Sequence, residues 1–143
     1  MATKTIYTAQ ATVTGGREHG HGRTEDGVLD VQLRQPGAEG ETGTNPEQLF
    51  AVGYAACFEG ALEVVGRRER VELGDVSIHS SVSLITTDEK GFNVAVGLDV
   101  TLPGIDDAEQ AKSIVAAAHQ VCPYSNATRG NVDVTLTANG QPV

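Results

Sequence analysis

The sequence predicts an α+β protein with mainly antiparallel sheet. Several short segments alternate apolar and polar residues with the period of two that strands show. Two longer segments carry apolar residues at helical spacing, each with a helix-capping residue near its start. The strand-like and helix-like segments are grouped, which is typical of the α+β class. Because 143 residues are the length of one domain, residues 1–143 are expected to form a single domain.

Two strands are expected in the N-terminal third. Residues 7–13 alternate apolar and polar side chains, and Gly15-Gly16 is expected to end this strand. Residues 17–26 are polar and are expected to form a loop. Residues 29–33 alternate again and predict a second strand, and the turn-forming residues of 35–44 predict a connection after it.

A long helix is expected after this connection. Thr44 begins a capping-box pattern, with Pro46 early in the helix and Glu47 three positions after the cap. From 49 to 65 the chain is apolar on nearly all faces, Glu59 and Glu63 being the exceptions. A helix that is apolar all round is buried in a core or in an interface.

The second half predicts a hairpin, a helix and a last strand. Residues 76–84 and 92–102 alternate on either side of a short turn, as the two strands of a hairpin do. Asp106 is a suitable cap for a helix that ends at Cys122, because the residue before a proline disfavours helical backbone. Residues 132–136 predict the final strand.

Charge and composition exclude several classes of function. The net charge of −9 argues against nucleic acid or an anionic membrane as a partner. No apolar run is expected to approach the roughly 20 residues of a membrane helix. The first ten residues show no export signal, so a cytoplasmic location is expected. There, a disulfide between the two cysteines would be transient or catalytic.

No metal site or cofactor is expected from the spacing of the ligand-type residues. The two cysteines lie far apart in the sequence, and the four histidines show no ligand spacing. His19 and His21 fall in the polar loop and match no role, so they are expected to be solvated.

Cys57 is the first candidate for chemistry. Helical spacing surrounds it with small residues that leave room above the sulfur: Gly53, Ala56, Gly60 and Ala61. Larger side chains nearby could wall an apolar, substrate-binding pocket: Phe50, Tyr54 and Phe58. The alternative is a core cysteine packed against a partner helix, because free cysteine is among the most buried residue types.

Cys122 and a cation are the other candidates. The carboxyl end of a helix is electronegative and does not favour a thiolate, so Cys122 suits a resolving thiol better than a nucleophile, unless it is simply buried. A nucleophilic thiol needs a nearby cation, for which Arg17 and Arg23 are the candidates, with Glu47 to hold one of them. On one straight helix, however, Glu47 and Cys57 lie about 15 Å apart along the axis. They can share a site only if the helix breaks near Gly53 or if two subunits contribute.

The motifs GGREHGHG, GVLDVQL, TNPEQLFAVGYAACFEGAL and VCPYSNATRGNVDVTL resemble, in order and over nearly the whole chain, the organic hydroperoxide resistance (Ohr) branch of the Ohr/OsmC family. The resemblance implies a thiol-dependent peroxidase without metal or cofactor, in which Cys57 is the peroxidatic and Cys122 the resolving cysteine. It implies that Arg17 and Glu47 contact each other and the reactive sulfur. It further implies an intertwined OsmC-like homodimer around long central helices, acting on alkyl and fatty-acid hydroperoxides and recycled by dithiols or lipoylated proteins.

Two alternatives stay open beside this interpretation. One is an OsmC-type peroxidase with a broader substrate range. The other is a non-enzymatic dimer that binds an apolar ligand near Phe50, Tyr54 and Phe58. Thiol loss on treatment with an organic hydroperoxide separates the second alternative from both peroxidases.

Overall fold

The computed structural model describes residues 3–38, 40 and 42–143. Helices and strands occur in both halves of the chain, which confirms the predicted α+β class. The chain divides into two compact units, Met1–Leu49 and Phe50–Val143.

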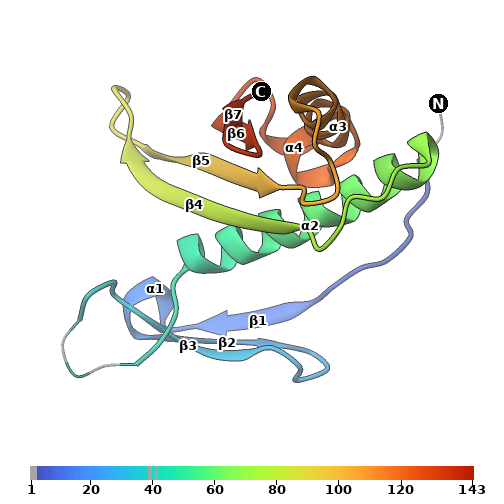
Figure 1. Cartoon of the computed structure of the whole chain (residues 1–143). Helices are drawn as coiled ribbons and strands as arrows, with labels where there is room; N and C mark the ends of the chain where they lie inside the picture. The colour runs from blue at the N-terminus through green and yellow to red at the C-terminus, as the bar shows by residue number, and fades with distance from the viewer. Residues whose placement is uncertain (1–2, 39, 41) are drawn as a thin grey trace. The chain divides into compact units, whose positions relative to one another are not determined.

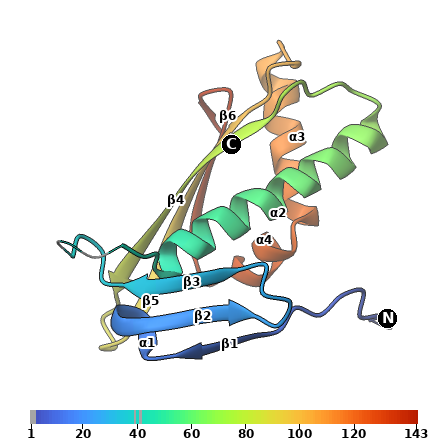
Figure 2. The same ribbon diagram turned by 90° about the horizontal axis from the view of Figure 1, so that it is seen from below.

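The first unit holds a three-stranded antiparallel sheet in the order β1-β2-β3, whose strands lie side by side in Figure 2. The strands are β1 (Ala11–Thr14), β2 (Gly20–Thr24) and β3 (Asp30–Arg34). β1 overlaps the C-terminal part of the strand predicted at 7–13 and ends one residue later, and β3 matches the second predicted strand to within one residue at each end. The connection predicted at 35–44 contains no strand or helix among its described residues, 39 and 41 lying outside them.

The loop predicted at 17–26 is wrong, because this segment forms a helical turn, α1 (Gly16–His19), followed by β2. Gly15 and Gly16 have φ values of 78° and 75°, which are accessible to glycine at little cost and allow the sharp turn after β1. Gly20 has no room for a side chain, since a Cβ would lie 2.0 Å from the Gly16 carbonyl oxygen. Polar composition hid β2 because this strand lacks the apolar alternation on which strand prediction depends.

The second unit holds a four-stranded sheet in the order β4-β5-β6-β7. The predicted hairpin is confirmed as β4 (Ser77–Thr86) and β5 (Phe92–Thr101), the two long strands in Figure 1. β6 (Asp133–Ala138) is the predicted last strand and pairs with β5 in parallel. β7 (Gln141–Pro142) adds an antiparallel partner that the sequence analysis missed. The Asn139-Gly140 turn, with both residues at positive φ, was the available signal for this hairpin.

Three helices complete the chain: α2 (Pro46–Glu69), α3 (Ala108–Val121) and α4 (Pro123–Thr128). α2 confirms the long helix, and α3 confirms the helix that ends before Cys122. The cap of α3 is Asp107 instead of Asp106, since the Asp107 carboxylate accepts from the Gln110 backbone N–H at 2.9 Å. α4 was not predicted.

The core of the second unit lies between its helices and one face of the sheet. Val96, Leu98 and Val100 alternate along β5 and are at most 4% exposed. They belong to one buried cluster with side chains of α2 and α3, among them Tyr54, Phe58, Leu62, Ile114 and Val115. This packing fixes α2 and the α3–α4 segment against the same sheet, and each of these elements carries one cysteine.

α2 corrects one expectation about membranes. This helix is long and apolar enough to cross a membrane by length and composition alone, although the sequence analysis found no run of that kind. A core helix passes the same test, so the finding is weak evidence. Six residues of α2 are buried, and others, such as the 72%-exposed Val52, are not.

Candidate active site

Two free thiols meet in the second unit. Cys57 lies on α2 and is partly exposed, whereas Cys122 lies between α3 and α4 and is fully buried. The Cys122 side chain lies close enough to the Cys57 thiol to affect its ionisation. The structure therefore brings together the two cysteines that the sequence singled out. Proximity of two thiols is the arrangement from which a disulfide can form without large movements of the chain.

The surroundings of Cys57 within this unit do not favour its thiolate. Burial raises the pKa of the Cys57 thiol above its ordinary value, because a charge is poorly solvated there. The hydrogen bond and charge of Cys122 raise this pKa further, whereas the backbone N–H of Tyr124 lowers it by donating to the sulfur. A reactive Cys57 therefore requires a cation, which is the requirement that the sequence analysis stated.

The position of Cys122 follows from the proline after it. Cys122 leaves the helical conformation with a ψ of 123°, and its own N–H still donates to the Ala118 carbonyl at 2.9 Å. Pro123 then begins α4, where its missing N–H costs nothing. Proline as a first helical residue is the signal that could have predicted α4. The resulting junction turns the Cys122 thiol and the Tyr124 amide towards Cys57.

A hydrogen-bonded network that the sequence analysis missed lies at the same junction. The Tyr54 hydroxyl contacts Ser125 Oγ at 2.7 Å and Thr128 Oγ1 at 3.3 Å. Ser125 Oγ also contacts His119 Nδ1 at 2.8 Å. Arg129 donates to the His119 carbonyl at 2.6 Å. No local pattern marks this network, because its members come from three helices.

The pocket predicted around Cys57 is filled in part by the protein itself. Tyr54 and Phe58 are fully buried in the core, so of the three proposed pocket residues only Phe50 keeps some exposure. The room expected at Gly53 is occupied by Tyr124, since a Cβ there would lie 2.9 Å from the Tyr124 hydroxyl. The Phe50, Tyr54 and Tyr124 rings contact one another with centroids 5.5–6.1 Å apart.

Arg17 and Glu47 meet in the first unit. Arg17 Nη2 donates to both carboxylate oxygens of Glu47, at 2.8 and 2.7 Å. Glu47 is free for this pairing because the capping box predicted from Thr44 does not form. The cap is Asn45, whose Oδ1 accepts from the Gln48 N–H at 2.9 Å. Glu47 is thereby displaced from the capping role and remains the partner of Arg17.

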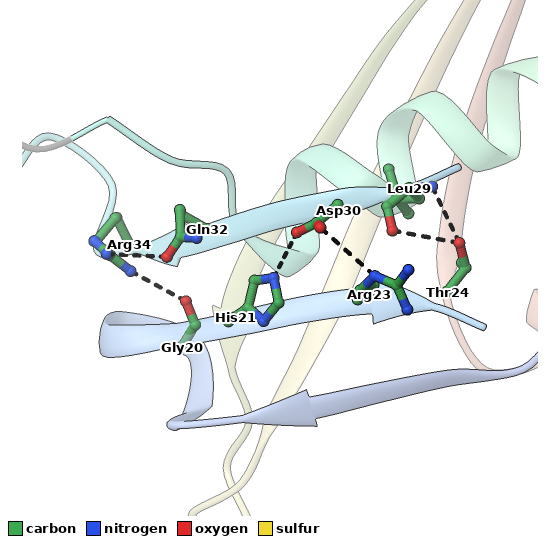
Figure 3. A network of polar contacts seen from close by, with 8 residues as sticks. All are labelled: Gly20, His21, Arg23, Thr24, Leu29, Asp30, Gln32 and Arg34. Atoms are coloured by element: carbon green, nitrogen blue, oxygen red, sulfur yellow. Dashed lines mark hydrogen bonds and ion pairs between the residues drawn. The ribbon is translucent and has the colours of Figure 1, made fainter. Parts of the chain in front are cut away.

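Arg23, the other candidate cation, is engaged elsewhere in the same unit. Its Nε lies 3.7 Å from Asp30 Oδ2, and His21 Nε2 contacts Asp30 Oδ1 at 2.5 Å. Figure 3 shows both side chains directed from β2 to Asp30 on β3. His21 therefore pairs with a carboxylate across the sheet, a partner that the sequence did not predict, while its side chain stays 43% exposed, as expected of a solvated histidine. Of the two arginines, Arg17 is the one that Glu47 holds.

The helix break suggested near Gly53 is absent, because α2 runs unbroken from Pro46 to Glu69. Glu47 and Cys57 therefore cannot meet on one copy of this helix. Within residues 3–38, 40 and 42–143, no group of three or more His, Cys, Asp or Glu side chains could hold a metal ion.

Comparison with known proteins places this geometry in a family. Residues 36–137 match the family model described as OsmC-like protein. The organic hydroperoxide resistance protein of Xanthomonas axonopodis pv. citri (strain 306) is 54% identical over 138 residues, which cover 94% of this chain and 95% of that protein. The protein OhrB of Bacillus subtilis (strain 168), also named an organic hydroperoxide resistance protein, is 52% identical over 134 residues, 92% of this chain and 96% of its own.

Solved structures agree with these relatives. The crystal structure of OhrB of Bacillus subtilis superposes with a TM-score of 0.87 at 50% identity, covering 93% of this chain and 98% of that one. A putative organic hydroperoxide resistance protein of Vibrio cholerae, with captopril bound in one of its active sites, gives a TM-score of 0.91 at 43% identity over 100% and 99% of the two chains. The chain therefore has the OsmC-like fold and belongs to the Ohr/OsmC family, among the organic hydroperoxide resistance proteins.

Proposed function

We propose that this chain is a thiol-dependent peroxidase that reduces organic hydroperoxides to alcohols. The observation that carries the proposal is the proximity of the partly exposed Cys57 thiol to the buried Cys122 thiol. The names of the relatives supply the substrate class, because they are organic hydroperoxide resistance proteins. Alkyl and fatty-acid hydroperoxides are the proposed substrates.

The proposed chemistry uses both sulfurs in turn. The Cys57 thiolate attacks the distal oxygen of the hydroperoxide, the O–O bond breaks, and the departing alkoxide takes a proton to become the alcohol. Cys57 is then a sulfenic acid. The Cys122 thiol attacks that sulfur and water leaves, which forms the Cys57–Cys122 disulfide. A dithiol or a lipoylated protein returns two electrons by thiol–disulfide exchange and restores both thiols.

Arg17 is the proposed cation of the site. The second unit alone raises the pKa of Cys57, so a positive charge has to come from outside it. The ion pair with Glu47 uses only Nη2 of the guanidinium, which keeps other N–H groups available for a sulfur or an alkoxide oxygen. Glu47 opposes a thiolate by like charge, so its benefit comes through holding Arg17.

A homodimer is the proposed assembly, in which Arg17 and Glu47 of one copy act on Cys57 of the other. Two observations support it. The unbroken α2 keeps Glu47 and Cys57 of one chain about 15 Å apart along the axis. The small or apolar residues Val52, Ala56 and Gly60 follow one another at four-residue spacing on α2 and are all exposed. Such a stripe permits close approach of a second helix. The proposed location is the cytoplasm, where a disulfide is transient.

Replacing each cysteine with serine tests the two roles. Cys57→Ser should abolish consumption of cumene hydroperoxide. Cys122→Ser should consume about one equivalent, turn over poorly with dithiols, and accumulate sulfinic and sulfonic forms of Cys57. Thiol counting and mass measurement of the linked peptides report both results. If Cys122→Ser loses the first equivalent and Cys57→Ser keeps it, the assignment is reversed.

Two comparisons test substrate and reductant. The rate with cumene hydroperoxide should exceed the rate with hydrogen peroxide, and equal rates would favour the broader OsmC-type peroxidase. Dihydrolipoamide should support turnover better than a monothiol at equal thiol concentration, since a dithiol closes its own disulfide after the first exchange. If no hydroperoxide consumes the protein's thiols, a non-enzymatic binding protein would be favoured.

A further inference from the structure

We propose that Tyr54, Ser125 and His119 are positioning residues, which hold the α3–α4 junction, and with it the Cys122 thiol and the Tyr124 amide, against Cys57. The inference rests on the proposed function in one respect, since it takes Cys122 as the resolving thiol. It adds three side chains to the site, whose side-chain hydrogen bonds run among themselves and to Thr128.

The positions of these residues along the chain support the inference. Tyr54 lies three residues, about one helical turn, before Cys57 on α2. His119 lies three residues before Cys122 on α3, and Ser125 lies three residues after it on α4. The chain of hydrogen bonds from Tyr54 through Ser125 to His119 therefore joins the helix of the first cysteine to both sides of the second.

Burial argues that these polar groups do more than fill space. Tyr54 and Ser125 are 0% exposed, and Tyr54 stands within the apolar cluster of the core. A phenylalanine would fill nearly the same volume without needing a hydrogen-bond partner, and a buried hydroxyl is costly unless it is bonded. Apolar packing tolerates small displacements of a helix. A series of hydrogen bonds between buried side chains, in contrast, keeps all its donors and acceptors paired in only one arrangement of the helices. Such a chain is suited to fixing where α4 lies against α2.

The protonation state of His119 decides which group donates and which accepts in each of these hydrogen bonds. Burial lowers the pKa of His119 and the charge of Arg129 lowers it further, so the imidazole is neutral near pH 7. With its proton on Nε2, Nδ1 accepts from the Ser125 hydroxyl, and the Ser125 oxygen accepts from the Tyr54 hydroxyl. Arg129 secures the backbone on both sides, since its N–H donates to the Ser125 carbonyl and its guanidinium donates to that of His119.

The expected consequence is specific to one step. Attack by Cys57 uses the sulfur on α2, a helix that the apolar side chains Phe58, Leu62 and Val65 also hold in the core. Disulfide formation requires the Cys122 sulfur to reach bonding distance of about 2.05 Å with a defined dihedral angle. Loosening the α3–α4 junction should therefore slow the second step most, and slow the first step less, through a weaker contact of the Tyr124 amide with the Cys57 sulfur.

The aromatic disulfide dithionitrobenzoate measures the rates of the first attack and of the resolution step separately, without any hydroperoxide. Cys57 thiolate attacks one of its sulfurs and releases one nitrothiobenzoate. Cys122 thiolate then attacks Cys57 of the mixed disulfide and releases a second. Stopped-flow absorbance separates the two phases, so the rate of resolution is measured apart from the rate of the first attack.

Tyr54→Phe and Ser125→Ala should each slow the second phase at least about fivefold, since each removes a buried hydroxyl with two hydrogen-bond partners, and should slow the first phase clearly less. The matched controls Tyr7→Phe and Ser83→Ala remove the same atoms at exposed positions and should change neither phase. His119→Asn, which retains an acceptor near Nδ1, should recover part of the resolution rate that His119→Ala loses. With cumene hydroperoxide, slow resolution should appear as more over-oxidised Cys57 by mass measurement.

A purely structural role gives a different result. Lower midpoints of thermal unfolding with an unchanged ratio of the two rates in Tyr54→Phe and Ser125→Ala would overturn the inference. If His119→Asn and His119→Ala resolve equally slowly, the hydrogen bond of His119 to Ser125 has no positioning role. If the wild-type protein consumes no hydroperoxide, the proposed function fails, but the two phases with dithionitrobenzoate still test the positioning role.

Discussion

Replacing Arg17 with alanine should raise the pKa of Cys57 and slow its alkylation at neutral pH. The reason lies in the surroundings of the sulfur, because burial and the Cys122 thiol raise this pKa and a single amide N–H, that of Tyr124, lowers it. A thiol of ordinary pKa is only a few per cent thiolate at pH 7, and this one would hold less without further help. In the proposed mechanism, an efficient nucleophile therefore depends on the guanidinium of Arg17, which pairs with Glu47.

The expected size of the effect follows from the charge. A cation within about 4–6 Å of an ionisable group shifts its pKa by about 1–3 units in favour of the anion. Loss of Arg17 should accordingly cut the thiolate fraction of Cys57 at pH 7 by about 10- to 1,000-fold. Glu47→Ala should cost less, because it leaves the guanidinium present and removes only the group that orients it.

Iodoacetamide alkylation as a function of pH measures this shift. A Cys122→Ser background leaves Cys57 as the single thiol, since the chain has two cysteines. The alkylation rate rises with pH through the pKa, and its midpoint should move upward in Arg17→Ala. Arg23→Ala is the matched control, because Arg23 pairs with Asp30 instead of Glu47 and should leave the midpoint unchanged. Identical profiles for the two arginine variants would refute the role given to Arg17.

Three further predictions concern stability. Asn45→Ala should lower the free energy of unfolding by about 1 kcal/mol in urea titration, since Asn45 caps α2, whereas Thr44→Ala should cost only a few tenths. The pKa of His119 is lower in the folded protein than in the unfolded chain, so the unfolded chain binds a proton more readily. The free energy of unfolding should therefore fall as the pH drops through about 6.5. His119→Asn should weaken this pH dependence, as measured by thermal unfolding at several pH values. Gly53→Ala should change the free energy of unfolding by less than about 1 kcal/mol, because better helix propensity offsets the weaker ring packing of a displaced Tyr124; a loss above about 3 kcal/mol would mean that the ring cannot move.

Periodic segments were predictable from the sequence because one physical pattern dominates them. β5 alternates over its whole length, and its buried residues Val96, Leu98 and Val100 are those the alternation selects. α2 is apolar around its circumference, and no competing turn signal interrupts it. β2 was not predictable in this way, since its residues are Gly-His-Gly-Arg-Thr and its place in the sheet is fixed by pairing with β1 and β3.

The candidate site was predictable only through motifs. Spacing along the chain left a buried structural thiol open for both Cys57 and Cys122, and only the family motifs indicated that the two react. Their proximity depends on how α3 and α4 pack on α2, which no local pattern encodes. Capping residues stand side by side at Thr44 and Asn45, so the sequence could not tell which one caps α2. That choice decides whether Glu47 is occupied at the helix end or free to bind Arg17.

The parallel pairing of β5 with β6 has a consequence for the newly made chain. The β4–β5 hairpin joins neighbouring stretches and can form early, whereas β6 can dock only after α3 and α4 have crossed back over the sheet. Cys122 travels within that crossover. The two sulfurs are therefore expected to meet late in folding, after synthesis has passed the final strand, so that an emerging polypeptide has little opportunity for premature oxidation.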